Sequence, residues 1–169
     1  MQEDHYKDLY QKIIPKTCVF EKSILQRFAN CQAANKHLLA EREAINCNSH
    51  NCHNQCLSLH KELRSRARFT LNQTSAEEPL PHNKELKLQV GGLIGLKLLL
   101  SGADPATIKS QLDFQKRYEC QQQAIDDIAT LLASAIEKYS AVDKLPYQEL
   151  IRAINLSQIR KQRRRPKSV

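Results

Sequence analysis

Apolar residues recur at steps of four and three through most of this chain, which is the spacing of one buried face of an α-helix. The strongest early stretch begins at Val19 and predicts a helix to about residue 45, where an Asn- and Ser-rich run at 46–51 favours a loop. Its stripe consists of Phe20, Ile24, Phe28, Cys31, Asn35, Leu38, Arg42 and Ile45. A shorter helix over residues 3–14, closed by Pro15, is expected ahead of it.

Further helices follow in the same rhythm. Residues 52–71 predict a second long helix, and the stretch 72–83, which contains Asn and Pro, predicts a loop. Residues 84–100 are apolar on nearly every side, which is typical of a helix at the centre of a core. Residues 105–139 would form a helix of about 52 Å, so a break near 113–119 is expected. A last helix opens at Pro146.

These patterns predict an all-α fold, a compact bundle of five or six helices, because no Val-, Ile- or Thr-rich alternating run is bounded by hairpin turns. The 169 residues suit one domain at 1–156, with a cysteine-rich half at 1–71, the loop at 72–83 and a leucine-rich half at 84–156. Aromatic residues make up 5% and tryptophan is absent, so the core is built mainly from Leu, Ile, Val and Ala.

Three glycines lie inside the predicted central helix. The stretch from Gly91 to Gly95 lacks the Gly-Lys-Ser/Thr ending of a Walker phosphate loop. Gly91 and Gly95 are four residues apart and share one helical face, where small residues let a second helix approach closely. We therefore expect a tight helix crossing here and no nucleotide site.

The positive charge is concentrated at the C-terminal end. The formal net charge is +8, but six of the 26 lysines and arginines lie in residues 157–169, leaving 20 against 18 acidic residues in 1–156. The six are Arg160, Lys161, Arg163, Arg164, Arg165 and Lys167. Such a run without acids predicts a disordered basic tail that binds nucleic acid or an acidic protein surface. A solubilising end without a partner is the alternative.

Soft metal ligands gather between Cys47 and His60, where fourteen residues hold three of the six cysteines and three of the six histidines. Cys52 and Cys56 are four residues apart and would project from one helical face, while the Asn-rich loop can turn Cys47 back toward them. With His50 as the first choice for a fourth ligand, this pattern predicts one metal centre, either zinc or an iron–sulfur cluster.

The spacing matches no standard zinc finger, so other ligands stay open. His53 and His60 are helical alternatives to His50, and Cys18 is the substitute if the centre is an iron–sulfur cluster. Cys31 is expected to be a small core residue, because it lies in the apolar stripe between Phe28 and Leu38. An unbroken helix would also separate it from Cys47 by about 24 Å, too far for the two to share one small site. Reduced thiols without any metal are the alternative interpretation of the whole cluster.

The chain carries no catalytic or nucleotide-binding motif, which disfavours an enzyme. The N-terminus lacks the features of a secretory signal, and the longest apolar run is too short to span a bilayer, which predicts an intracellular, cytoplasmic protein. Metal-linked structural or regulatory binding is the leading interpretation. The alternatives are a metal-free helical protein that binds nucleic acid or acts as an adaptor, and a thiol redox protein.

Overall fold

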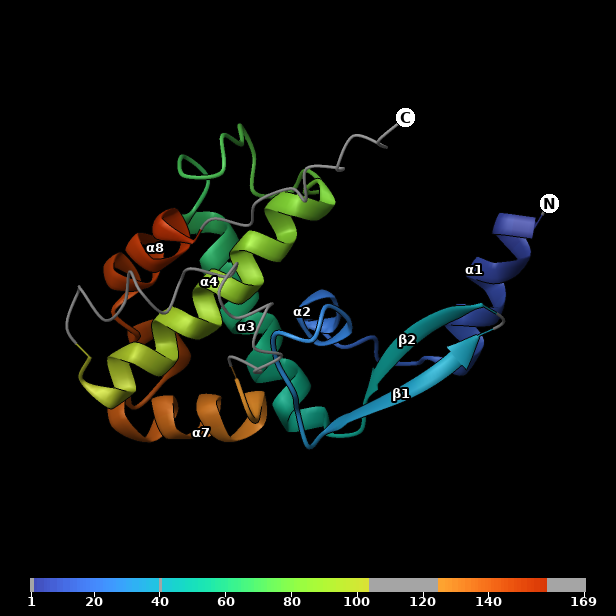
Figure 1. Ribbon diagram of the computed structural model, residues 1–169, viewed down its shortest axis with the longest axis horizontal. Helices are drawn as coiled ribbons and strands as arrows, with labels where there is room; N and C mark the ends of the chain where they lie inside the picture. Colours follow the sequence, from blue (N-terminus) through green and yellow to red (C-terminus); the bar gives the residue numbers. More distant parts are fainter. Residues whose placement is uncertain (1, 40, 104–124, 158–169) are drawn as a thin grey trace, which may run out of the picture.

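Helices make up most of the structure, and a β-hairpin interrupts them near the N-terminus (Figure 1). This computed structural model describes residues 2–39, 41–103 and 125–157. Its elements are α1 (Gln2–Ile13), α2 (Glu21–Leu25), β1 (Ala34–Leu39), β2 (Arg42–Cys47), α3 (His50–Arg66), α4 (His82–Ser101), α7 (Ile128–Tyr139), the 3-10 helix η1 (Val142–Lys144) and α8 (Tyr147–Leu156). The hairpin and α1 extend away from the group formed by α3, α4, α7 and α8.

The central element is α4, as the sequence predicted. Twelve of its 20 residues are buried, and it contacts α2, α3, α7 and α8. The helix ends at Gly102, whose φ of 67° is a left-handed conformation that glycine adopts without steric cost. The apolar stretch on all sides of α4 therefore forms the centre of the main hydrophobic core.

The glycines of α4 let α8 approach closely, which confirms the predicted tight crossing. A Cβ atom added at Gly95 would lie 2.7 Å from Ala153 Cβ, and one added at Gly91 would lie 2.8 Å from Ile154 Cα. No methyl group fits at either distance unless the two helices move apart. The crossing thus depends on the absence of side chains at these two positions.

The all-α prediction is wrong, because residues 34–47 include a two-stranded antiparallel sheet. β1 pairs with β2 in a register that runs from Ala34 opposite Cys47 to Leu39 opposite Arg42. The expected helix over residues 19–45 is reduced to α2. Arg27 follows with a φ of 61°, in the left-handed region, and a right-handed helix cannot continue through it.

The stripe that suggested the long helix had polar residues, Asn35 and Arg42, among its last positions, so its apolar support was thin after Cys31. Burial does not alternate cleanly along β1 or β2, and a strand pattern was therefore weak as well. Long-range backbone pairing decides the outcome. The Cys18 N–H donates to the Ile45 carbonyl at 2.8 Å, so that residues 16–18 run along the edge of β2 opposite β1.

A small second core supports the outer part of the hairpin. Ile14, Leu39 and Ala44 are buried together, and Tyr6 and Tyr10 of α1 pack against them. The Tyr10 hydroxyl donates to Glu21 Oε1 at 3.1 Å. α1 is thereby tied to α2 as well as to the hairpin.

Other predicted boundaries agree with the structure. The loop at 72–83 falls largely in the connection between α3 and α4, and the last helix, α8, follows Pro146. α7 begins at Ile128, where the Asp127 side chain caps it by accepting from the N–H groups of Ala129 and Thr130. The break predicted near 113–119, Cys120 and the six basic residues of the tail lie outside the described residues.

Candidate metal centre

Three backbone segments meet around Cys47, the last residue of β2. On one edge, the Cys47 N–H donates to the Lys16 carbonyl at 2.8 Å, which places Cys18 beside the end of this strand. On the other edge, Ala34 of β1 lies opposite Cys47. The Ala34 N–H donates to the Cys31 carbonyl at 3.1 Å, so Cys31 stands at the entry to β1. The hairpin that replaces the predicted long helix therefore brings Cys31 toward Cys47.

The segment around Cys31 is also fixed to the helical core. Asn30 N–H donates to the Ile125 carbonyl at 2.9 Å, and Ile128 N–H donates back to the Asn30 carbonyl at 2.9 Å. The carboxylate of Asp127, which caps α7, accepts from Gln32 N–H at 2.9 Å. Cys31 thus joins the start of the hairpin to the start of α7.

The fourth segment is α3, which begins directly after Cys47. The Ser49 hydroxyl caps this helix by accepting from Cys52 N–H at 3.2 Å. His53 Nε2 lies 3.1 Å from the Thr17 carbonyl and ties the first turn of α3 to the segment that carries Cys18. One turn further on, Cys56 is 8% exposed and belongs to the main core.

Cys18, Cys31, Cys47 and Cys56 form what we call the four-cysteine cluster. Charges on Cys18, Cys31 and Cys47 would each affect the titration of Cys56, and Cys31 and Cys47 would affect that of Cys18. A charge on Cys47 would likewise affect the titration of Cys31. Each of the six pairs among these four cysteines is therefore within electrostatic reach. Of the four cysteines whose charges affect Cys56, Cys52 has the weakest effect.

Burial disfavours the thiolate form of Cys18, Cys31 and Cys56. Burial raises the pKa of Cys18 to about 12 and also raises the pKa values of Cys31 and Cys56. Charges on the neighbouring cysteines add to the rise at all three residues. A thiol with a raised pKa stays protonated at neutral pH and is a poor nucleophile. The surroundings of Cys18, Cys31 and Cys56 therefore do not activate these thiols as nucleophiles.

Backbone N–H groups oppose this rise at two of the sulfurs. The Phe20 N–H is hydrogen-bonded to the Cys18 sulfur. Cys31 has two such donors, the N–H groups of Ala33 and Ala129, which come from the hairpin and from α7. Both contacts favour the thiolate over the thiol, and a thiolate is the form that binds a metal.

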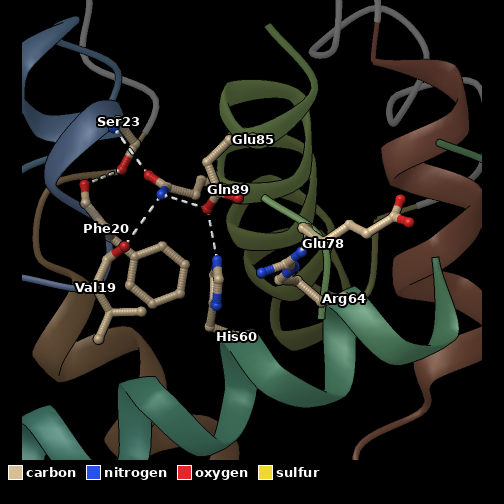
Figure 2. Close-up of polar contacts among 8 residues, drawn as sticks. All are labelled: Val19, Phe20, Ser23, His60, Arg64, Glu78, Glu85 and Gln89. Carbon is tan, nitrogen blue, oxygen red and sulfur yellow. Dashed lines mark hydrogen bonds and ion pairs between the residues drawn. The ribbon is translucent and has the colours of Figure 1, made fainter. Parts of the chain in front are cut away.

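A polar network fixes the residues that follow Cys18 to α4 (Figure 2). Gln89 donates to the Val19 carbonyl at 3.1 Å, and its amide oxygen accepts from Ser23 N–H at 3.1 Å. The same side chain donates to Glu85 at 2.8 Å. The carboxylate of Glu85 also accepts from His60 Nε2 at 2.5 Å. The backbone next to Cys18 is therefore held by contacts from two helices.

The histidines proposed as ligands have other partners. His50 is exposed, and its Nε2 lies 3.1 Å from the side-chain amide of Asn54. His53 Nε2 contacts the Thr17 carbonyl, and His60 Nε2 contacts the Glu85 carboxylate. Of the predicted ligands, Cys47, Cys56 and the substitute Cys18 lie within electrostatic reach of one another, and Cys52 lies half-buried nearby.

Sequence reasoning left out Cys31, because the assumed helix placed it far from Cys47. The sequence offers no clear signal for the hairpin that brings it back. Across residues 2–39, 41–103 and 125–157, no three His, Cys, Asp or Glu side chains gather in an arrangement that could hold a single metal ion. The four sulfurs share one region of the protein without converging on one point.

An open groove beside α8 is the other feature with binding chemistry. It is lined by Arg66, Tyr147, Gln148, Ile151 and Arg152. The Arg66 guanidinium lies over the Tyr147 ring and also pairs with Glu62 at 2.9 Å, and Arg152 pairs with Glu149 at 3.0 Å. Both arginines already have carboxylate partners, so the groove offers little free positive charge to a phosphate.

Comparison of the chain with protein-family models, with curated proteins and with solved structures finds no match in any of the three. Within the described ranges, no helix combines the length and the apolar character needed to cross a membrane.

Proposed function

We propose that this protein is a metal-linked structural binding protein whose metal is held by thiolates of the four-cysteine cluster. The observation that supports the proposal is that Cys18, Cys31, Cys47 and Cys56, from four separate segments of the chain, lie within electrostatic reach of one another. Thiolate sulfur is a preferred ligand of zinc and of iron in iron–sulfur clusters.

Without a metal, Cys18, Cys31 and Cys56 lie in or against the main core as protonated thiols. Their titrations disfavour one another, and an uncoordinated thiolate is further disfavoured by burial. A bound metal reverses this balance, because the cation stabilises the thiolates and releases their protons on binding. The N–H groups directed at Cys18 and Cys31 add to the same effect.

The role that this location supports is to hold the N-terminal segments on the helical core. The four ligands would join residues 16–18, the start of β1, the end of β2 and α3 through one centre. Metal binding to such ligands contributes directly to folding, because the unfolded chain holds no preformed site. A reducing, cytoplasmic setting belongs to the proposal, since the cysteines must stay reduced to bind metal.

Metal analysis of the full-length protein, purified without a metal-affinity tag under anaerobic conditions, tests the proposal. We expect a stoichiometric metal in the unaltered protein and its loss in Cys56→Ala. Cys52→Ala is the matched control, because it removes a half-buried cysteine of the same helix that lies outside the cluster. A wild-type protein without bound metal contradicts the proposal.

The second candidate function is nucleic-acid or adaptor binding through the basic tail, which the charge distribution favours. Six bases without acids in residues 157–169 contrast with a nearly neutral remainder, and both arginines of the α8 groove are paired with acids. Deleting residues 157–169 should remove most of the affinity for DNA, RNA and anionic surfaces. If all six bases contact phosphates of duplex DNA, the slope of log affinity against log salt falls by roughly five units on deletion. Unchanged binding after the deletion contradicts this function.

A further inference from the structure

We propose that the connection between α3 and α4 binds single-stranded nucleic acid, with one base stacked on Phe69 and the phosphates paired with Arg64, Arg68 and Lys84. Binding at this surface does not depend on the metal. It also goes beyond binding by the basic tail, because the folded protein then contributes a contact that distinguishes single strands from duplexes.

Phe69 is the most exposed large apolar side chain among the described residues, with 85% of its surface accessible. It lies in the turn after α3, in the connection that projects from the helical group (Figure 1). The Leu71 N–H donates to the Ala67 carbonyl at 3.0 Å, and both residues belong to the main core. The ring is therefore held at the surface by an anchored backbone, and an exposed aromatic ring is the platform on which unpaired bases stack.

Three cationic side chains surround this turn. The Arg68 guanidinium lies over the Phe69 ring, 5.8 Å from its centroid. Lys84 Nζ, in the first turn of α4, donates to the Asn72 carbonyl at 3.4 Å. Arg64, one helical turn before Arg68, donates to a backbone carbonyl at the other end of the connection. The positive charges thus lie around one exposed aromatic ring.

These three charges have no carboxylate partner within the part of the chain that the structure describes, where the ion pairs join other side chains. The carbonyl that Arg64 contacts is that of Glu78, whose carboxylate extends away from the guanidinium (Figure 2) and accepts from the Thr74 hydroxyl at 3.3 Å. Arg68 Nε is covered and lacks a hydrogen-bond partner among the described residues. Carbonyl groups and a ring do not neutralise a cation, so this surface attracts anions more strongly than the groove beside α8, where both arginines are paired.

Single-stranded nucleic acid is the partner that matches both features of the surface. Its phosphates supply negative charge at regular intervals, and its bases can leave the stack to cover an aromatic ring. A duplex hides the faces of its bases, and an acidic peptide supplies charge without a base to stack. Glu77 and Glu78 are exposed in the same connection and disfavour phosphates there, so we expect the strand to pass over Phe69 toward Lys84.

Fluorescence anisotropy of the full-length protein with labelled oligo(U) and oligo(dT) of about twelve nucleotides tests the stacking contact. Phe69→Ala should weaken binding to the single strands by about tenfold and leave binding to a duplex of the same length unchanged. Phe69→Tyr, which keeps a ring, should bind as the unaltered protein does. Leu38→Ala is the matched control, because it also truncates an exposed apolar side chain. Photocrosslinking with 5-iodouridine in the strand should label Phe69.

The phosphate contacts are tested by the salt dependence of the same binding. Arg64→Gln and Lys84→Gln should each lower the slope of log affinity against log salt by roughly 0.7 for single strands. Arg152→Gln removes the same charge from an arginine that pairs with Glu149 at 3.0 Å, so its slope should not change. Circular dichroism verifies that each variant is folded.

Unchanged single-strand affinity in Phe69→Ala, or crosslinks confined to residues 157–169, would overturn this proposal and leave binding by the tail standing. Tighter binding of a polyglutamate peptide than of either oligonucleotide would overturn it in favour of an acidic protein partner. A full-length protein that binds neither single strands nor duplexes would refute both this surface and nucleic-acid binding by the tail.

Discussion

The crossing of α4 with α8 and the four-cysteine cluster are held together in different ways. At the crossing, Gly91 and Gly95 admit a second helix, and fully buried leucines and isoleucines fill the space around it. Around the cluster, the elements are short: α2 has five residues and each strand has six. Backbone hydrogen bonds join these short segments, and Cys56 lies in the main core while Cys18 and Cys31 pack against it.

This contrast shows how one chain can stabilise two regions by separate means. Long apolar helices supply enough buried surface to hold themselves together. Short irregular segments bury less, and small structures of this type commonly depend on a metal or another cross-link. If the proposed function holds, stability in the region around Cys47 would depend on the bound metal, and stability at the crossing of α4 and α8 would not.

The largest expected effect is that of metal removal, which should act on one region only. A ligand present at about 1,000 times its dissociation constant stabilises the state that binds it by about 4 kcal/mol. After anaerobic chelation, the amide hydrogens of Cys18 and Cys47, which pair with Ile45 and Lys16, should exchange much faster. Amides in the middle of α4 should keep most of their protection. Equal loss of protection in both regions would show that they are one cooperative unit.

Gly95→Ala should give the opposite pattern, with loss of stability at the crossing. The added methyl would meet Ala153 Cβ at 2.7 Å, and overpacking of this kind costs about 1–3 kcal/mol. Adding Ala153→Gly removes the obstructing methyl and should recover part of the loss. Urea unfolding of the single and double variants measures both effects. A Gly95→Ala variant as stable as the unaltered protein would show that α8 is not packed against α4 at this distance.

Gln89→Ala should affect both regions, because its amide joins α4 to the residues after Cys18. The change leaves Ser23 N–H without its acceptor and removes one donor from the buried carboxylate of Glu85, which together cost about 1–3 kcal/mol. We also expect faster metal release to a chelator, since the Val19 carbonyl loses its contact. Asn83→Ala, at an exposed position in the first turn of α4, is the control. If Gln89→Ala releases metal at the same rate as the control, the contacts of Gln89 do not contribute to metal binding by the cysteines.

The smallest expected effect is a pH dependence from Glu85. Burial raises the pKa of Glu85, but the hydrogen bond and charge of His60, a hydrogen bond from Gln89 and the charge of Lys22 outweigh it and leave the pKa below its usual value. The carboxylate therefore stabilises the fold above the pKa of the unfolded state, about 4.3, and this contribution disappears as the pH falls through the lower folded-state pKa. Glu85→Gln should lower the free energy of unfolding by about 1 kcal/mol at neutral pH. The variant should also lose less stability than the unaltered protein as the pH falls. If unfolding curves show the same loss of stability at acid pH in both proteins, Glu85 does not make this contribution.

The sequence was sufficient for the helical region because its signals are local. The apolar residues of α4 lie on all sides of one helix, Gly91 and Gly95 mark its close crossing, and Pro146 precedes α8. Helical periodicity and small residues act within a few positions of one another, so they can be read without knowledge of the partner. The partner itself, α8, was not evident from the pattern.

The hairpin and the cysteine partners were decided by tertiary structure. β2 is held by backbone hydrogen bonds to residues 16–18, and Cys31 is held by α7, which lies about a hundred residues further along the chain. Every residue except proline offers the same backbone N–H and C=O groups, so the side chains do not show which strands will pair. The stripe from Phe20 to Ile45 fitted a helix, but the left-handed backbone of Arg27 interrupts it. The sequence by itself determined that soft ligands surround Cys47; the folded chain determined that Cys18 and Cys31 stand beside it, because only long-range pairing brings those segments together.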